Sequence, residues 1–250
     1  MSIYDQLLSE IFHRHRGPTQ DEFEFEREEM EEILRSWKKR VKNLGDIIYS
    51  YRSGRRLLPE SITTTGDWLI SGRGKGRYAF IRLKRSPYIS IPTDLQIIDI
   101  LDATPDIILK YRSHDEQGLL TRIAYNRLVD TFLKITTYRL QGHLRAFVSD
   151  HGQIEVDDLY LGVDKDGFQY AIPVEAKTPE EPLGVVQIIS QNAFAAERFA
   201  DLRLRSIAIK AWHDDTFFFV EFNSAINPNQ LEVIEYRRYR LVREDGLNNA

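Results

Sequence analysis

The chain has 250 residues, of which 42% are hydrophobic and 11% aromatic, and it contains no cysteine. A chain of this length and apolar content can bury a substantial core, and the lack of cysteine excludes disulfide frameworks, thiolate zinc sites and cysteine nucleophiles. Its 34 basic and 38 acidic residues give a net charge of −4, which as a sum argues mildly against a nucleic-acid-binding protein. Apolar runs are short and broken by charges, and the N-terminus lacks a signal-peptide pattern. We therefore expect a cytoplasmic protein with no membrane partner.

The charge is unevenly distributed along the chain. Residues 21–32 hold eight acids and one arginine, a net charge of −7, whereas residues 35–86 hold fourteen lysines and arginines against three acids, a net charge of +11. We interpret the acidic run as the solvated face of a helix. The basic segment is dense enough to be a contact surface for a polyanion; the alternative is a solvated surface whose charge the acidic run offsets.

Hydrophobic periodicity and turn residues predict an α/β (α+β) fold. The predicted elements in chain order are a helix over 21–43, short strands within 57–91, a helix over 115–136, strands over 137–148, 153–163 and 168–177, a helix over 184–200, and strands over 204–212 and 216–222. We therefore expect two parts. Residues 1–92 form a basic, helical and β-rich region, and residues 93–250 form a core with a mixed central sheet flanked by helices.

Two neighbouring predicted strands carry charges among apolar residues. The first holds Glu155, Asp157 and Asp158, and the second holds Glu175 and Lys177. The run 163–168 between them is a tight-turn signal, so the two strands are expected to form an antiparallel hairpin. Period-two alternation places the side chains of Glu175 and Lys177 on one face of the second strand.

The register of this hairpin decides which acid joins Glu175 and Lys177. A three-residue turn with Gly167 in the left-handed conformation sets Asp157 opposite Glu175, and Glu155 opposite Lys177. A four-residue turn brings Asp158 to that face instead. We prefer the first register, because glycine suits the left-handed position, and the second stays open.

A cluster of this kind suits phosphodiester hydrolysis. Two close carboxylates repel each other unless a hard cation such as Mg²⁺ lies between them. Such a metal can polarise the phosphate and lower the pKa of a bound water, and a neighbouring lysine can position that water or help to deprotonate it. The alternative is an exposed hairpin with a surface ion pair, because a bare Glu-X-Lys sequence is common.

The acidic strand, the turn and the run Pro173-Val-Glu175-Ala-Lys177 together resemble the PD-(D/E)XK nuclease superfamily, and within it type II restriction endonucleases. The likeness covers roughly residues 115–222. It implies a restriction-endonuclease-like fold and Mg²⁺-dependent cleavage of double-stranded DNA that leaves 5′-phosphate and 3′-hydroxyl ends. By this resemblance Asp157 and Glu175 bind the metal, and Lys177 is the catalytic lysine.

The resemblance leaves some assignments open. Asp158 is an alternative metal ligand, because the first acid is doubled. Glu116, at the start of the helix over 115–136, matches a further catalytic acid of many relatives, and it equally suits a helix-dipole or capping role. Gln187 and Gln191, one helical turn apart, match a position where some relatives place a polar residue facing the site; the alternative is that both face solvent.

A nuclease must also hold the phosphate backbone, and lysine and arginine supply most of that affinity. The predicted DNA contacts are the cations of two glycine-containing stretches, Arg52, Arg55, Arg56, Arg73, Lys75 and Arg77. Glycine lets the backbone approach a phosphate, and arginine can read guanine edges. The alternative is a basic hairpin with no ligand. Arg139, His143 and Arg145 recur on one face of the strand over 137–148, which lies either near DNA or on the wet side of the sheet.

We therefore expect a Mg²⁺-dependent type II restriction endonuclease of a prokaryotic restriction-modification system, cutting double-stranded DNA at a specific site. The resemblance implies a homodimer, since a two-fold protein naturally reads a palindromic site. The alternatives are a repair or junction-resolving nuclease on the same core, and a non-catalytic DNA-binding module. The six histidines show no metal-ligand spacing, so a zinc site is not expected.

Overall fold

The computed structural model describes residues 2–17, 19–52, 54–113, 115–213 and 215–243. Its elements in chain order are α1 (Ile3–His15), β1 (Glu22–Glu26), α2 (Arg27–Ser36), α3 (Leu44–Arg52), α4 (Glu60–Thr63), β2 (Trp68–Gly72), β3 (Arg77–Arg82), β4 (Ile97–Leu101), α5 (Asp106–Tyr111), α6 (Glu116–Tyr125), α7 (Leu128–Leu133), β5 (Thr136–Val148), β6 (Gly152–Val163), β7 (Gln169–Lys177), α8 (Val185–Arg198), β8 (Arg203–Leu204), β9 (Ser206–Ala211), β10 (Thr216–Phe222), the 3₁₀ helix Pro228–Gln230 and β11 (Val233–Val242).

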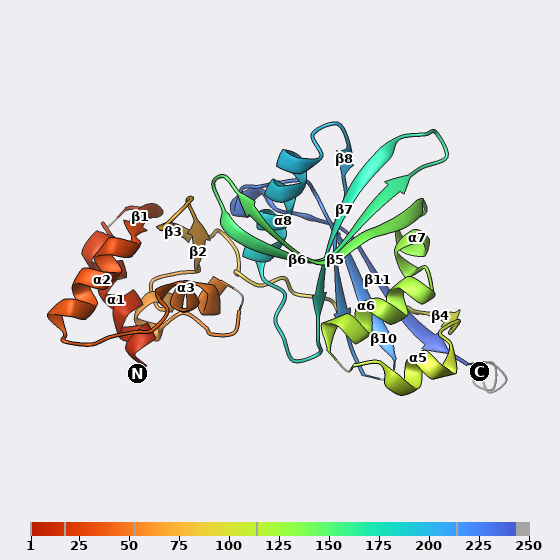
Figure 1. Cartoon of the computed structure of the whole chain (residues 1–250), viewed down its shortest axis with the longest axis horizontal. Coiled ribbons are helices and arrows are strands. Elements are labelled where there is room, and N and C mark those ends of the chain that lie inside the picture. The colour runs from red at the N-terminus through yellow and green to blue at the C-terminus, as the bar shows by residue number, and fades with distance from the viewer. Residues whose placement is uncertain (1, 18, 53, 114, 214, 244–250) are drawn as a thin grey trace.

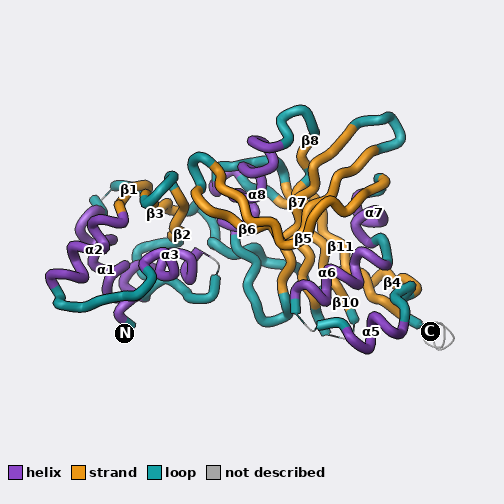
Figure 2. Tube along the Cα trace, viewed as in Figure 1, coloured by secondary structure: helices purple, strands orange, loops and turns teal. Residues whose placement is uncertain are grey.

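These strands form two sheets (Figures 1 and 2). The smaller sheet has the order β1-β3-β2, and the larger has the order β4-β11-β10-β9-β7-β6-β5, with β8 paired to β7. The larger sheet is mixed, because β7 runs parallel to β9 and β4 runs parallel to β11 while the other neighbours along its order are antiparallel. The predicted mixed α/β core is therefore confirmed, with β4 and β11 as two strands that the sequence analysis did not predict.

The N-terminal region packs helices against one face of the small sheet, and Figure 1 shows it to one side of the large sheet. Its hydrophobic cluster joins Phe12 of α1 and Met30 of α2 to Phe80 of β3. The predicted helix over 21–43 is wrong at its start, because residues 22–26 form β1. The sequence Glu-Phe-Glu-Phe-Glu alternates with period two, so Phe23 and Phe25 are buried while the glutamates between them are exposed.

The large sheet carries helices on both faces. α6 and α7 cover one face, where Leu120 and Phe132 pack against Ile172 and Phe219. α8 covers the other face, where Phe194 packs with residues of β6 and β7. Phe217, Phe218 and Phe219 are all buried, as predicted for core residues.

The predicted helix over 115–136 is two helices. α6 ends at Tyr125 and α7 begins at Leu128, because Arg127 takes the left-handed conformation with φ 48°. The side chain of Asn126 at this break donates hydrogen bonds to Asp102 and Thr104, and its oxygen accepts one from the backbone of Ala103. The break therefore gives the loop after β4 its polar partners.

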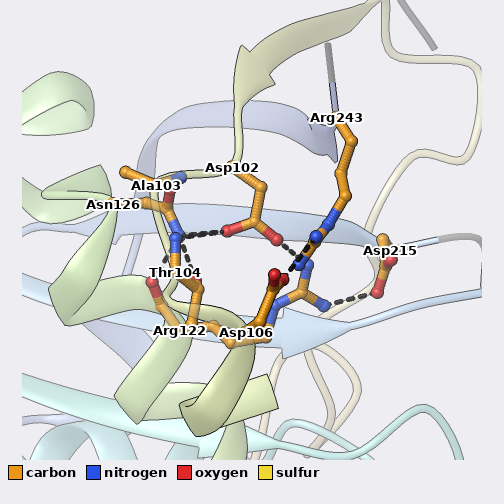
Figure 3. A network of polar contacts seen from close by, with 8 residues as sticks. All are labelled: Asp102, Ala103, Thr104, Asp106, Arg122, Asn126, Asp215 and Arg243. Atoms are coloured by element: carbon orange, nitrogen blue, oxygen red, sulfur yellow. Dashed lines mark hydrogen bonds and ion pairs between the residues drawn. The ribbon is translucent and has the colours of Figure 1, made fainter. Parts of the chain in front are cut away.

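A buried charge network fixes α6 to the sheet (Figure 3). One guanidinium nitrogen of Arg122 lies 2.8 Å from a carboxylate oxygen of Asp102, and the other pairs with Asp215 in the turn between β9 and β10. Near this network Arg243 pairs with Asp106 at 2.6 Å. The network connects α6, the loop after β4 and the β9–β10 turn.

The N-terminal region meets the large sheet at two places, at α8 and at the tip of the β5–β6 hairpin, where His151 lies next to Gly72 and Arg52. Leu69 and Ile81 of the small sheet share a hydrophobic cluster with Val186 and Ile189 of α8. The predicted boundary between residues 92 and 93 stays a prediction. The hydrophobic cluster just described contains residues from both sides of it. Among the described residues no helix is both long and apolar enough to cross a membrane.

Candidate active site

The β6–β7 hairpin has the three-residue turn that the sequence analysis preferred. The amide of Asp164 donates to the carbonyl of Phe168, and Gly167 has φ 83°. The ladder pairs Leu159 with Pro173 and Asp158 with Val174, and there it ends. Beyond that point the carboxylate of Asp157 accepts the hydrogen bond of the Ala176 amide at 2.8 Å. The diverging strands thus leave Asp157 beside Glu175 and Lys177.

Lys177 lies between two carboxylates. Its ammonium is 2.8 Å from Glu175 Oε1 and 3.1 Å from Glu116 Oε1. Glu116 reaches the cluster from the first turn of α6, where the helix cap is made by Asp115. Glu116 therefore contacts the cluster, Asp115 rather than Glu116 caps the helix, and the place of Glu116 in the first turn still suits the helix-dipole role.

α8 contributes two amides to the same cluster. The amide nitrogens of Gln187 and Gln191 donate to the two carboxylate oxygens of Glu175. Both glutamines therefore face the site rather than solvent. Their Oε1 atoms are buried with no hydrogen-bond partner in the described part of the chain. Two acceptor oxygens are thus left beside Glu175.

Burial and crowding set the charge states of this cluster. Burial raises the pKa values of Asp157 and Glu175, and repulsion from Glu116 adds to the effect on both. Burial opposes the charged form of Lys177, but the carboxylates of Glu175 and Glu116 outweigh it and raise the pKa of the lysine. Lys177 is therefore a stable ammonium. A further cation bound beside it would stabilise the charged forms of the carboxylates.

Asp158 lies apart from this cluster. Its carboxylate is fully buried, and Nε of Arg139 on β5 lies 2.7 Å from one of its oxygens. Burial raises its pKa, and the Arg139 ion pair opposes that shift. Of the two candidate acids, Asp157 alone stands beside Glu175 and Lys177.

Glu155 also differs from its expected place opposite Lys177. It pairs with His143 at 3.0 Å and with Arg145 at 3.8 Å on β5. The basic side chains of β5 therefore pair with the acids of β6. Arg139 pairs with Asp158, and His143 and Arg145 pair with Glu155. The sequence analysis placed these residues either near DNA or on the solvent side of the sheet, and neither interpretation included this pairing.

The predicted DNA contacts divide into internal and exposed residues. Arg52 is partly buried and donates to the carbonyl of His151, 3.4 Å away, so it lies deeper than the other predicted contacts, and its contact with DNA stays a prediction. Arg73 pairs with Glu22 and with Glu24 at 3.7 Å, and Arg77 lies 4.0 Å from Glu24. The acidic strand β1 therefore neutralises part of the basic hairpin.

Four of the predicted cations are exposed, namely Arg55, Arg56, Lys75 and Arg77. Arg55 lies over the ring of Tyr49 at 5.0 Å, and Arg56 lies over the ring of Tyr4 at 5.1 Å. The sequence analysis did not anticipate that Tyr49 on α3 lies near the acidic cluster. Burial raises its pKa, and Glu155 and Glu175 contribute to the increase, so its hydroxyl lies within electrostatic reach of the cluster. No sequence signal joins α3 to β7 across so long a separation.

The cluster offers few protein ligands to a hard cation. No group of three or more His, Asp or Glu residues in the described ranges is arranged to hold a metal ion. Asp157 and Glu175 are two buried carboxylates with raised pKa values, and the free oxygens of Gln187 and Gln191 lie beside them. This chemistry fits Mg²⁺, which commonly uses one or two carboxylates and keeps several waters or substrate phosphates.

Comparison with known proteins found no relative for this chain: no family model, no curated protein and no solved structure matches it.

Proposed function

We propose that the chain is a Mg²⁺-dependent endodeoxyribonuclease with a restriction-endonuclease-like core, acting on double-stranded DNA in the manner of a type II restriction enzyme. The observation that carries the proposal is the convergence of Asp157, Glu175, Lys177 and Glu116, which come from β6, β7 and α6. Two acids and a lysine at the diverging ends of two strands are the groups that phosphodiester hydrolysis uses.

The residues have distinct roles in this proposal. Asp157 and Glu175 hold the metal, and Gln187 and Gln191 fix the orientation of the Glu175 carboxylate. Bound Mg²⁺ supplies Lewis-acid polarisation of the scissile phosphate. Lys177, anchored between Glu116 and Glu175, orients the attacking water and stabilises negative charge on the phosphate oxygens. Arg55, Arg56 and Lys75 attract the DNA backbone.

The test is cleavage of plasmid and genomic DNA with Mg²⁺ by the wild type and by Glu175→Ala and Lys177→Ala. Each substitution removes a group at the reacting phosphate, so we expect the cleavage rate to fall by on the order of 10²–10³-fold or more. Asp166→Ala and Lys165→Ala are matched controls, because both residues are exposed in the turn of the same hairpin. Undiminished cleavage by the Glu175 or Lys177 variant would show that the site is wrong.

The digestion pattern separates the two nuclease classes. Discrete fragments from a mixed genome support a restriction enzyme, and sequencing their ends gives the recognition site and the stagger of the cut. Cleavage confined to branched or damaged substrates supports a repair or junction-resolving nuclease. A homodimer, expected for a palindromic site, is tested by sedimentation in the presence of that site.

A second candidate, a non-catalytic DNA-binding module, is favoured by one observation. Lys177 already pairs with both Glu116 and Glu175, so part of the negative charge of the cluster is compensated within the fold. In that case the cluster stabilises the fold, and the wild type binds DNA without cutting it in any divalent metal. Glu175→Ala then lowers the melting temperature and leaves DNA affinity unchanged.

A further inference from the structure

A cavity of about 300 Å³ lies at the junction of the N-terminal region and the core. Its walls come from the end of α3, the start of β2, the segment 86–88 and the start of α8. The cavity adjoins the candidate active site, because Gly184 and Val186 line it and the next residue, Gln187, binds Glu175. A Cβ added to Gly184 would lie 2.7 Å from Gln187 Oε1, so this part of the cavity wall adjoins a side chain that binds Glu175.

The cavity walls are mainly apolar and aromatic, with Arg52, Thr63, Asp67 and Ser86 as polar lining residues. Tyr51, Trp68 and Tyr88 contribute rings, and Ile70 and Val186 contribute aliphatic side chains. The wall formed by Tyr88 is fixed to the core, because the amide of Ile89 donates to Leu183 and the amide of Val185 donates to Pro87, each at 2.9 Å. Such a surface favours a flat, apolar group.

Arg52 gives the cavity its polar specificity. Its Nε is enclosed and has no hydrogen-bond partner within the described ranges, and the bond that it makes is to a backbone carbonyl, that of His151, at 3.4 Å. Burial lowers its pKa, and no carboxylate contributes to hold the charge. A buried guanidinium without an anionic partner is costly, and because Arg52 lines the cavity, an acceptor on a ligand bound there would favour its charge.

A nucleobase combines the two properties that the cavity selects. It has flat apolar faces for the rings of Tyr51 and Tyr88, and it has acceptor atoms on one edge for Arg52. Guanine matches best, because its O6 and N7 are adjacent acceptors for a guanidinium. A simple phosphate or carboxylate would satisfy Arg52 but would leave the aromatic walls without a partner.

We propose that this cavity is a nucleobase pocket, which takes one base unstacked from the DNA next to the cleavage site. The DNA source rests on the proposed nuclease function, whereas recognition of the base rests on the cavity alone. Unstacking a base from a duplex costs a few kcal/mol. Stacking on the walls and the hydrogen bonds of Arg52 offset that cost.

The test is calorimetric titration of the full chain with dGMP, and with deoxyribose 5-phosphate as a probe that lacks the base. We expect dGMP to bind and the sugar phosphate not to bind. Arg52→Met should weaken dGMP binding by at least about tenfold, because a charged hydrogen bond is lost. Arg85→Met is the matched control, since Arg85 is an exposed arginine next to the wall segment 86–88 that does not itself line the cavity.

The melting temperature distinguishes a ligand-binding role from a structural one. Removing an unpartnered buried charge should leave the melting temperature of Arg52→Met equal to or above that of the wild type. If Arg52→Met does not fold, Tyr88→Ala replaces it, with the exposed Tyr111→Ala as control. Loss of dGMP binding in Tyr88→Ala but not in Tyr111→Ala supports the pocket.

The outcomes separate this inference from the proposed function. If the wild type cuts DNA but binds no dGMP up to about 10 mM, or binds the sugar phosphate equally well, the pocket is overturned and the nuclease stands. If dGMP binds in an Arg52-dependent way and no DNA is cut, the pocket stands and the nuclease falls. Glu175→Ala should lose cleavage and keep dGMP binding.

Discussion

At the scale of single residues, Arg122 shows how strongly this fold depends on one buried charge. Its side chain is 5% exposed, and it pairs with Asp102, whose side chain is 3% exposed. Burial works against the charged form of Asp102, but hydrogen bonds from Thr104, Arg122 and Asn126 outweigh it and lower the pKa of Asp102 to about 2. The aspartate is therefore held charged in a place where a lone carboxylate would be unfavourable.

We predict that Arg122→Met lowers the free energy of unfolding by about 3–5 kcal/mol, because it leaves Asp102 buried without a counter-ion. Urea denaturation at neutral pH measures this change. Arg127→Met is the control, since the Arg127 side chain is 62% exposed and its pair with Asp130 should contribute at most about 1 kcal/mol. Equal losses in the two variants would contradict the role given to the network.

The site could be predicted from the sequence where local rules decide the geometry. Gly167 specified a three-residue turn, and the turn fixed which acid lies beside Glu175. Only the resemblance suggested that Glu116 joins the site, because no local rule links α6 to β7, and its contact with Lys177 was not predicted. The proximity of Tyr49 had no signal at all, since it depends on how the N-terminal region packs against the core.

At the scale of elements, β2 and the β5–β6 turn approach so closely that only glycine fits at position 72. A Cβ added to Gly72 would lie 2.1 Å from the carbonyl oxygen of His151. That oxygen also accepts the hydrogen bond from Arg52. Displacing the turn would therefore disturb two contacts between the N-terminal region and the core.

We predict that Gly72→Ala lowers the free energy of unfolding by about 3 kcal/mol, because backbone must move to make room for the methyl group. Gly45→Ala in α3 is the control. Its Cβ would meet Asn43 Oδ1 at 3.3 Å, and alanine favours the helix by up to about 1 kcal/mol. Chemical denaturation of both variants is the measurement, and a Gly72→Ala protein as stable as the wild type would refute the close approach.

The elements that the sequence analysis misassigned share one physical cause. Apolar spacing over 21–43 fits a helix, but pairing with β3 buries Phe23 and Phe25 together, and this non-local gain selects a strand. The helix over 115–136 is broken because Asn126 serves the loop after β4. In both places a tertiary partner outweighs the local preference, and single-sequence patterns contain no information about that partner.

At the scale of the whole molecule, the two opposite charge blocks of the sequence lie together. β1 of the acidic run pairs with β3 of the basic segment, and Glu22 and Glu24 reach Arg73. The +11 segment is therefore partly neutralised within the fold, and its remaining exposed cations are fewer than the sequence count indicates. Where the N-terminal region meets the core, Arg52 and Arg73 lie near His151. This histidine is 8% exposed at the tip of the β5–β6 hairpin.

This junction predicts a pH dependence of the stability of the whole chain. Burial, with Arg52 and Arg73 nearby, lowers the pKa of His151 to about 4 from its ordinary value of 6.5. Between these values the unfolded chain binds a proton that the folded chain does not, so stability is full above pH 6.5 and falls as the pH approaches 4. The loss of stability should reach about 2 kcal/mol, since solvent screening reduces the full linkage value.

Urea denaturation of the wild type and of His151→Gln between pH 6.5 and pH 4 measures this loss. The variant should lack this component, and an identical slope in both proteins would assign the acid sensitivity to other groups.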